Sequence, residues 1–229
     1  LESAVRGARR SGIRALHCVS VMDRGIAAVL ADAVAPRLPR ETATWARASF
    51  GAPRVGLETG LAALDAARAA AGGDRVGFLL GPVSAHWCSP GLVEAIAGEA
   101  GRLGIGLQTH LLESPFQRRA DLAELGGSRV RSLADSGVLS PRWSFAHGVQ
   151  LDADDIARLA DAGASVVHNP GSNLRLGNGV APVGAMREAG INLALGLDSM
   201  GINDEAALFA EARLAWRLAG TGGAGAFDA

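Results

Sequence analysis

Short apolar runs alternate with amphipathic helical patterns along this chain, and this alternation limits the fold more than any other feature. The apolar runs lack the regular polar residues of a half-exposed strand, which is typical of parallel strands buried on both faces. A chain that alternates strand and helix with short links predicts a parallel α/β fold. The predicted strands are Ile13–Val21, Arg75–Leu80, Gly104–Thr109, Trp143–Ala146, Ala164–Val167 and Ile191–Leu197.

Helical patterns fill most of the segments between these runs, and several carry recognisable end signals. Asp152 can cap a helix that Gly163 closes, and Ser89 precedes Pro90 at the start of another. We interpret the Pro- and Arg-rich stretch from Ala35 to Arg54 as an irregular loop. The predicted helices are one that opens the chain at Leu1, then Val55–Ala71, Pro90–Leu103, Phe116–Ser136, Asp152–Ala162, Pro182–Ala189 and Asp204–Leu218.

Two parallel folds fit this alternation. A doubly wound sheet places a Gly-rich phosphate turn early in the chain, and the sequence has none there. A (β/α)8 barrel instead gathers functional residues where its strands end, which is where the unusual polar residues of this chain lie. Because a closed barrel needs eight strands and six are predicted, we expect an incomplete barrel, formed as one partial domain over residues 1–229.

The charge balance and the two cysteines argue against several classes of protein. The formal net charge is -1 and the longest basic runs are pairs of arginines, which argues against nucleic acid or a membrane surface as a partner. No apolar stretch is long enough to span a bilayer. Cys18 and Cys88 give neither a disulfide framework nor a Cys-x-x-Cys metal pair, which predicts reduced thiols and a cytoplasmic location. A homodimer, the commonest oligomer, stays open.

Four consecutive predicted strands each end in a histidine or an aspartate. His110, His147, His168 and Asp198 follow these strands directly, and Glu113 lies three residues past His110. In a barrel such strand ends converge on one pocket. Each residue alone has a plainer interpretation, such as a structural hydrogen bond, a helix cap or a solvated loop carboxylate. Their joint position at one edge favours a metal-assisted hydrolytic site.

Imidazole and carboxylate groups are the ligands that such a site needs. A divalent metal held by them, with one position open, lowers the pKa of water toward ~7. One carboxylate can accept the proton of that water, and a second acid must protonate the leaving group or a ring nitrogen. Asp198 and Glu113 suit these two roles. Zinc and iron both suit histidine and aspartate ligands, so the predicted cofactor is one divalent metal, zinc or iron.

Around these residues the sequence resembles the amidohydrolase superfamily, in the branch that holds cytosine, guanine and S-adenosylhomocysteine deaminases and triazine hydrolases. The resemblance covers nearly the whole chain, which would correspond to barrel strands three to eight of that family. The segment from Gly81-Pro82 to Trp87-Cys88-Ser89-Pro90 shares in it. The motifs that carry it are Thr109-His110-Leu111-Leu112-Glu113, Ala146-His147-Gly148, His168-Asn169-Pro170-Gly171-Ser172-Asn173-Leu174-Arg175-Leu176 and Gly196-Leu197-Asp198-Ser199.

The resemblance implies a role for each of the catalytic candidates. It implies that His110 is a metal ligand and that Glu113 carries a proton to a ring nitrogen of the substrate. His147 would hydrogen-bond the attacking hydroxide or the substrate. Asp198 would bind the metal and act as a base towards its water.

The resemblance also implies a substrate-binding loop. His168, Asn169, Ser172 and Asn173 would form this loop beside the substrate, although a rigid loop scaffold explains the Asn-Pro pair of the motif equally well. His86 is a further candidate for substrate contact, and a surface role is its alternative.

Two departures from the family pattern affect these roles. The family's His-X-His pair, which supplies two metal ligands at the end of its first strand, has no counterpart here, and His17 is interpreted as a core residue. Since the chain starts inside a helical pattern at Leu1 and stops in a Gly/Ala stretch, we expect truncation, with barrel strands one and two and the family's small β-sandwich missing. Adenosine-type members have a histidine where this chain has Val83, which weakens a nucleoside-deaminase assignment.

The leading hypothesis is a metal-dependent hydrolase of non-peptide carbon-nitrogen bonds that deaminates a nitrogen heterocycle. Glu113 favours deamination, because a ring nitrogen must then receive a proton. Loss of chloride or an alkylamine from a triazine-like ring is the alternative within the same branch. A catalytically inactive barrel fragment with a binding role is the alternative of a different class. A nucleotide-binding protein is disfavoured, because the run from Arg175 to Gly179 lacks the phosphate-loop pattern and is interpreted as a turn.

Overall fold

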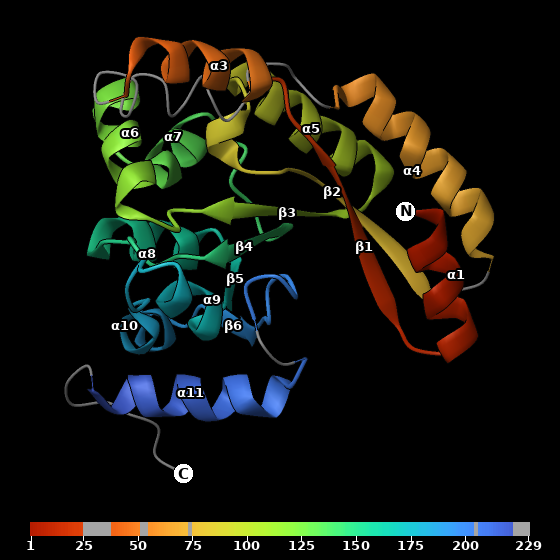
Figure 1. Ribbon diagram of the computed structural model, residues 1–229. Helices are drawn as coiled ribbons and strands as arrows, with labels where there is room; N and C mark the ends of the chain where they lie inside the picture. Colours follow the sequence, from red (N-terminus) through yellow and green to blue (C-terminus); the bar gives the residue numbers. More distant parts are fainter. Residues whose placement is uncertain (25–37, 51–54, 73–74, 204–205, 222–229) are drawn as a thin grey trace. The chain divides into compact units, whose positions relative to one another are not determined.

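The computed structural model describes residues 1–24, 38–50, 55–72, 75–203 and 206–221 of the chain. Its contacts divide the chain into two compact units, residues 1–109 and 110–229. The described strands form one sheet in the order β1-β2-β3-β4-β5-β6, and β3 (Gly106–Leu111) contributes residues to both units (Figure 1). The prediction of a single barrel domain over residues 1–229 stays a prediction.

In the first unit, β1 (Ala15–Val21) and β2 (Val76–Pro82) run parallel, with Ala15 opposite Val76, and β2 is parallel to β3. The helix α4 packs on β1 and β2, and α5 packs on β2, so that apolar strand residues are buried. The helices of this unit are α1 (Glu2–Ser11), α3 (Arg40–Phe50), α4 (Leu57–Ala71), a short 3₁₀ helix (Ala85–Trp87) and α5 (Pro90–Leu103).

In the second unit, β4 (Trp143–His147) is parallel to β5 (Ser165–His168), which is parallel to β6 (Asn192–Leu195). The rings of Trp143 and Phe145 stack in the core of this unit, with their centroids 5.3 Å apart. Its helices are α6 (Pro115–Leu125), α7 (Arg129–Asp135), α8 (Ala153–Asp161), α9 (Pro170–Arg175), α10 (Val183–Glu188) and α11 (Leu208–Thr221).

All six predicted strands are present, and each strand end lies within two residues of its predicted position. The parallel α/β class predicted from the apolar runs is therefore confirmed. The helix expected at Asp204–Leu218 begins at Leu208 and continues to Thr221, and residues 204–205 lie outside the described part of the chain. The segment after β5, expected as a loop, contains the six-residue helix α9.

The prediction of one helix over Phe116–Ser136 is wrong, because two helices occupy this segment. Gly126 adopts a left-handed φ of 64° and ends α6, and its N–H donates to the carbonyl of Leu122. A glycine takes this conformation without the steric cost of a Cβ. Ser128 then caps α7 by accepting the N–H of Arg131, so a second helix begins there.

The interpretation of Ala35–Arg54 as an irregular loop is wrong for its central part. Residues 40–50 form α3, and the carbonyl of Pro39 accepts the N–H of Ala43 in the first turn. A proline at this position is compatible with a helix, because the first N–H groups of a helix have no partner within it. Residues 35–37 and 51–54 lie outside the described residues.

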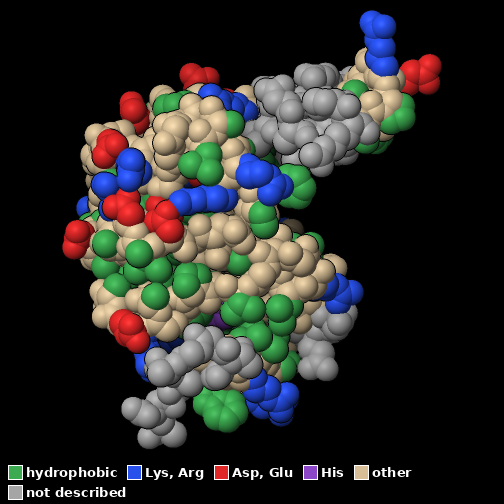
Figure 2. All heavy atoms as spheres, turned by 90° about the vertical axis from the view of Figure 1, so that its left-hand side faces the viewer, with side chains coloured by type: hydrophobic (Ala, Val, Ile, Leu, Met, Phe, Trp, Pro, Cys, Tyr) green, Lys and Arg blue, Asp and Glu red, His purple; other side chains and the backbone are tan. Residues whose placement is uncertain are grey.

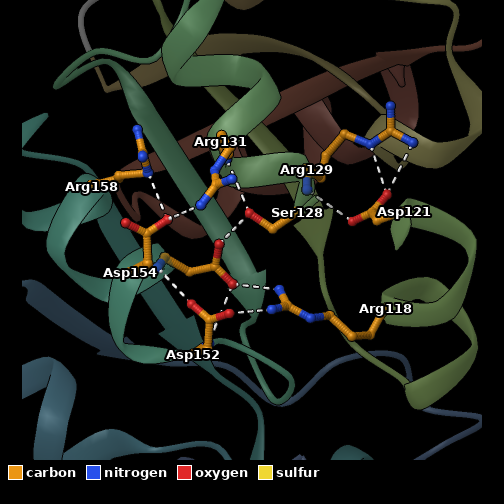
Figure 3. A network of polar contacts seen from close by, with 9 residues as sticks. Arg118, Asp121, Ser128, Arg129, Arg131, Asp152, Asp154 and Arg158 are labelled. Atoms are coloured by element: carbon orange, nitrogen blue, oxygen red, sulfur yellow. Dashed lines mark hydrogen bonds and ion pairs between the residues drawn. The ribbon is translucent and has the colours of Figure 1, made fainter. Parts of the chain in front are cut away.

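A polar network joins α6, α7 and α8 in the second unit (Figure 3). Arg118 of α6 pairs with Asp152, the N-cap of α8, and its Nη1 lies 2.7 Å from Oδ2 of the buried Asp155. Burial raises the pKa of Asp155, although hydrogen bonds from Ser128 and the backbone of Asp152 and the charge of Arg118 act in the opposite direction. Since α6 follows β3 and α8 follows β4, the network fixes the segments that leave these two strands.

The surface shows no large region of one charge in the view of Figure 2. Acidic and basic side chains lie interspersed there, separated by hydrophobic and uncharged groups. This mixture agrees with the formal net charge of -1. Among the helices of the described residues, none combines the length and the apolar character needed to cross a membrane.

Candidate active site

The residues predicted at the strand ends come together in the second unit. His110 lies near the end of β3, His147 ends β4, His168 ends β5, and Asp198 lies three residues past β6. Parallel strands bring their carboxyl ends to one edge of the sheet, so these positions share an edge. The rings of His110 and His147 stack there, with centroids 5.3 Å apart and planes inclined by 23°.

His147 lies at the centre of the cluster and is 1% exposed. Its Nε2 atom is 3.9 Å from Oδ2 of Asp198 and 4.0 Å from Oε2 of Glu113. Its Nδ1 atom is 2.9 Å from Oδ1 of Asn173 and 3.4 Å from Nδ2 of Asn169. Nδ1 cannot donate to the first amide and accept from the second at once, and the shorter contact assigns it the donor role. Nε2 is therefore the nitrogen that faces the two carboxylates.

Asp198 is held by two hydrogen bonds. The hydroxyl of Ser172 donates to its Oδ2 over 2.6 Å, and the N–H of Ser199 donates to its Oδ1 over 2.7 Å. Burial alone would raise the pKa of Asp198, but these hydrogen bonds and the nearby imidazoles of His147 and His110 lower it below its usual value. The side chain is therefore an ionised carboxylate at neutral pH.

Glu113 is held from two sides. Its backbone N–H donates to Oε1 of Gln117 over 2.7 Å, and its carboxylate accepts from Nδ2 of Asn178 over 3.3 Å. The carbonyl of Asn178 in turn accepts from the side chain of Gln150. The two partners of Glu113 thus come from two separate segments, and its carboxylate, like that of Asp198, lies within 4.0 Å of His147 Nε2.

Backbone strain is concentrated in this cluster. Within the described residues, the non-glycine residues with positive φ are Leu112 at 45°, His147 at 77° and Asp198 at 63°. Each such conformation costs about 1–3 kcal/mol and persists only where the surroundings enforce it. Two of the three are residues that the sequence marked as catalytic candidates, and the third precedes Glu113. The strain supports a functional rather than a merely structural role for these strand ends.

The helix α9 presents two of the predicted substrate-binding residues to the catalytic candidates. Ser172 and Asn173 are buried, and their side chains already contact Asp198 and His147. His168 is also buried, and this burial lowers its pKa to about 4, which the charge of Glu211 partly opposes. His168 is therefore neutral at physiological pH. Ser172 and Asn173 are in a position to orient catalytic groups.

The two remaining histidines lie in the first unit. His86 is 1% exposed, and its Nδ1 atom is 3.2 Å from the hydroxyl of Ser84. The surface alternative for His86 is therefore wrong, because the 3₁₀ turn after β2 directs its side chain inward. His17 is half-buried in β1, with its ring 6.3 Å from that of Phe78, so it lies at the margin of the core.

The described residues contain no group of three or more His, Cys, Asp or Glu side chains arranged to hold a metal ion. His110 and Asp198, the two ligands that the sequence predicts, supply an imidazole and an ionised carboxylate. These are suitable donors for zinc or iron, which take nitrogen and oxygen ligands from proteins. The chemistry of the donors fits a divalent metal, and their number requires further ligands.

Two residues of the cluster were not predicted from the sequence. Asn178 donates to Glu113 from the segment that had been interpreted only as a turn. Glu211 of α11 is 5% exposed and accepts the N–H of Gly171 at the start of α9. The sequence does contain a signal for Glu211. Its spacing from Leu214 and Leu218 places it on the same face of α11 as these two leucines, and this is the less exposed face. An acidic residue on such a stripe indicates a buried polar contact.

Curated relatives of this chain include deaminases of heterocycles. A 5-methylthioadenosine/S-adenosylhomocysteine deaminase from Teredinibacter turnerae is 38% identical over 135 residues, which are 59% of this chain and 30% of the relative. An 8-oxoguanine deaminase from Pseudomonas aeruginosa is 36% identical over 146 residues, 64% of this chain and 32% of the relative. The matched region thus spans about a third of the length of these relatives.

Solved structures share the fold. An adenosine deaminase from Xanthomonas campestris with bound zinc superposes with a TM-score of 0.79 at 24% identity, over 98% of this chain and 46% of that one. An atrazine chlorohydrolase from Arthrobacter aurescens TC1 complexed with zinc gives 0.75 at 24% identity, over 94% and 44%. The predicted barrel type of α/β fold, present in part, is confirmed by this likeness and by the parallel order of the six strands.

A family model places the chain among known sequences. The model described as the amidohydrolase family matches residues 8–228, which is nearly the whole chain. The match includes every strand-end residue of the cluster and all the motifs that carried the resemblance. The chain belongs to the amidohydrolase family.

Proposed function

We propose that this chain carries most of the active site of a metal-dependent hydrolase that deaminates a nitrogen heterocycle. The observation that carries the proposal is the placement of His147 Nε2 between two carboxylates, 3.9 Å from Asp198 and 4.0 Å from Glu113. Hydrolytic deamination needs two such groups, one to take a proton from water and one to return a proton to the substrate. The names of the relatives, which include S-adenosylhomocysteine and 8-oxoguanine deaminases, support this reaction class.

His110 and Asp198 would hold one divalent ion, zinc or iron, together with ligands beyond these two. A divalent ion bound there supplies Lewis acidity, which makes water a stronger acid and a better nucleophile. Both comparison structures contain zinc, which supports zinc as the metal. The ionised state of Asp198 suits a ligand, because only the deprotonated carboxylate binds a cation well.

Two carboxyl groups of this chain, those of Asp198 and Glu113, would each carry out a part of the proton transfers. Asp198 would accept a proton from the attacking water, whose oxygen forms a bond to the amidine-like carbon of the ring. Glu113 would donate a proton to the ring nitrogen next to that carbon, so that the carbon becomes tetrahedral. His147 Nε2 would hydrogen-bond the attacking oxygen. The proton on Asp198 would then pass to the exocyclic nitrogen, and the hydroxyl group on the tetrahedral carbon would return a proton to Glu113. The carbon-nitrogen bond would break as the carbonyl forms, and ammonia would leave.

The substrate would lie beside α9 and the strand ends. His168, Asn169, Ser172 and Asn173 remain our proposed substrate-side residues, and His86 a further one. The neutral state of His168 would let it donate or accept a hydrogen bond without attracting an anion. The contacts of Ser172 with Asp198 and of Asn173 with His147 support an orienting role for these two residues.

A second candidate function is loss of chloride or an alkylamine from a triazine ring. The structural likeness to an atrazine chlorohydrolase, with a TM-score of 0.75, favours it as the alternative. The two reactions share the attacking water and differ in the leaving group. An inactive barrel fragment that binds a ligand is the third hypothesis, and strain at His147 and Asp198 argues against it, because unused strain has no reason to persist.

We propose a cytoplasmic location and keep a homodimer as a prediction. Cys18 and Cys88 are both free thiols, which supports a reducing compartment.

The test measures ammonia and chloride release from purines, pyrimidines and chlorinated triazines by the zinc-loaded protein. Zinc-dependent ammonia release that is lost in Asp198→Asn supports deamination. Chloride release without ammonia would support the triazine alternative. Bound zinc with no release from any heterocycle, in a folded protein, would contradict hydrolysis by this site.

A further inference from the structure

We infer that Glu211 of α11 is a positioning residue that clamps together the two loops carrying Asp198 and the orienting side chains of α9. The inference rests on the proposed function, since it concerns the orientation of the proposed base. No chemical role at the substrate is required of Glu211. Its role is to hold backbone and side-chain groups that in turn hold the catalytic carboxylate.

The first half of the clamp is a contact with the loop after β5. Oε2 of Glu211 accepts the N–H of Gly171 over 3.0 Å. This N–H lies in the first turn of α9, where N–H groups have no partner within the helix. A Cβ at Gly171 would collide with the carboxylate, so the approach requires a residue without a side chain. The next two residues of α9 are Ser172 and Asn173, whose side chains contact Asp198 and His147.

The second half of the clamp is a contact with the loop after β6. Oε1 of Glu211 accepts from Nδ2 of Asn203 over 2.6 Å, and the same amide group donates to the carbonyl of Leu197 over 3.1 Å. Leu197 directly precedes Asp198, whose φ of 63° is a strained conformation. Asn203 therefore links the buried carboxylate to the peptide bond that leads into the proposed base.

The two halves meet again at the site itself. Ser172 of the first loop donates to Oδ2 of Asp198 in the second, over 2.6 Å. Glu211 thus fixes both ends of this contact, one through Gly171 and one through Asn203. Loss of the carboxylate frees both loops at once and lets the strained Asp198 relax.

The energetics also point to a specific use of this carboxylate. Burial of a polar side chain costs free energy unless hydrogen bonds replace its hydration. The N–H groups of Gly171 and Asn203 donate to the two oxygens of Glu211. If position 211 served packing alone, an apolar side chain could be buried there at a lower cost in free energy. The buried carboxylate of Glu211 is explained if one side chain with two acceptor oxygens must hold both loops.

The central variant of the test is Glu211→Gln, which keeps the shape and offers an acceptor to only one of the two loops. The matched control is Glu188→Gln, at an exposed glutamate at the end of α10. Two readouts do not depend on turnover. One is the rate of hydrogen exchange of the Gly171 amide. The other is a crystal structure of the variant, which shows whether Ser172 still contacts Asp198.

The expected result is a Gly171 amide that exchanges at least about tenfold faster in Glu211→Gln, with Ser172 and Asp198 beyond hydrogen-bond distance. In the active protein we expect kcat to fall by about ten- to hundredfold while KM changes by less than about threefold, because orientation rather than binding is lost. Glu188→Gln should match the parent in every readout. If Glu211→Gln does not fold, Asn203→Ala removes the hydrogen bonds of its amide to Glu211 and to the carbonyl of Leu197 and leaves the contact of Glu211 with Gly171. It should lower kcat in the same way.

A lower melting temperature with an unchanged kcat, or an intact contact between Ser172 and Asp198 in the variant, would overturn the clamp. Failure of the proposed function is a separate outcome. A parent protein that hydrolyses no heterocycle refutes the function, whereas the Gly171 exchange and the crystal structure still decide whether Glu211 holds the two loops.

Discussion

The Nδ1 atom of His147 lies 2.9 Å from Oδ1 of Asn173, and this contact decides which nitrogen of the imidazole faces the catalytic carboxylates. An amide oxygen only accepts hydrogen bonds, so Nδ1 carries the proton and Nε2 points toward Glu113 and Asp198. A histidine fixed in this way offers the same nitrogen to every substrate molecule. The relationship makes Asn173 a determinant of the state of His147.

Replacement of Asn173 by leucine should therefore lower kcat by at least about tenfold, with a smaller change in KM. Leucine fills the same volume and removes the acceptor, so that the imidazole can rotate or change its tautomer. Steady-state ammonia release from the zinc-loaded protein measures the effect. Asn192→Leu, at an exposed asparagine of β6, is the control. A folded Asn173→Leu protein with normal kcat would contradict this role.

Substitutions of the acidic groups should separate proton transfer from metal binding. Glu113→Gln and Asp198→Asn should each lower turnover by at least about 100-fold, because each removes one of the two acid-base groups. Zinc affinity, measured by competition with a chelator, should persist in Glu113→Gln and fall in Asp198→Asn. His110→Ala should also lose zinc. Normal zinc affinity in His110→Ala would refute its assignment as a ligand, and full turnover in Glu113→Gln would refute the proton shuttle.

The stability of the protein should depend on pH through His168. Its pKa is lowered to about 4 in the folded protein by burial, against about 6.5 in an unfolded chain. The unfolded state therefore binds more protons between these values, and stability falls as the pH drops from 6.5 toward 4. The full difference corresponds to roughly 3 kcal/mol. Urea unfolding at several pH values measures it, and His168→Gln should flatten the dependence. An equally steep profile in His168→Gln would assign the effect to other groups.

The sequence predicts the parts of this protein that depend on local pattern. Each apolar run encodes a strand by itself, so all six strands appear where they were expected. His147 and His168 directly follow such runs, and a residue at the end of a parallel strand is placed at the functional edge without knowledge of the rest of the fold. The break between α6 and α7 was missed because Gly126 and Ser128 lie inside an otherwise continuous helical pattern.

The contacts that orient the site could not be predicted, because they join distant parts of the chain. Asn178 donates to Glu113 across 65 positions, and Glu211 accepts from Gly171 across 40. Neither pair has a separation along the sequence that would reveal the contact, and each contact depends on how the loops pack. The strained backbone of Asp198 is likewise a consequence of tertiary contacts, since aspartate has no strong local preference for this conformation.

Arg118→Met should destabilise the second unit by about 2 kcal/mol, because it leaves the buried carboxylate of Asp155 without its cation. Arg118 is itself partly exposed, so water screens part of the loss, and the pair with the more exposed Asp152 adds little. Urea unfolding at pH 7 measures the change. Arg131→Met is the matched control, because its guanidinium pairs with Asp154 where both side chains are about half exposed, and it should cost less than about 0.5 kcal/mol. Equal losses in the two variants would show that burial of Asp155 is not what makes the Arg118 pair matter.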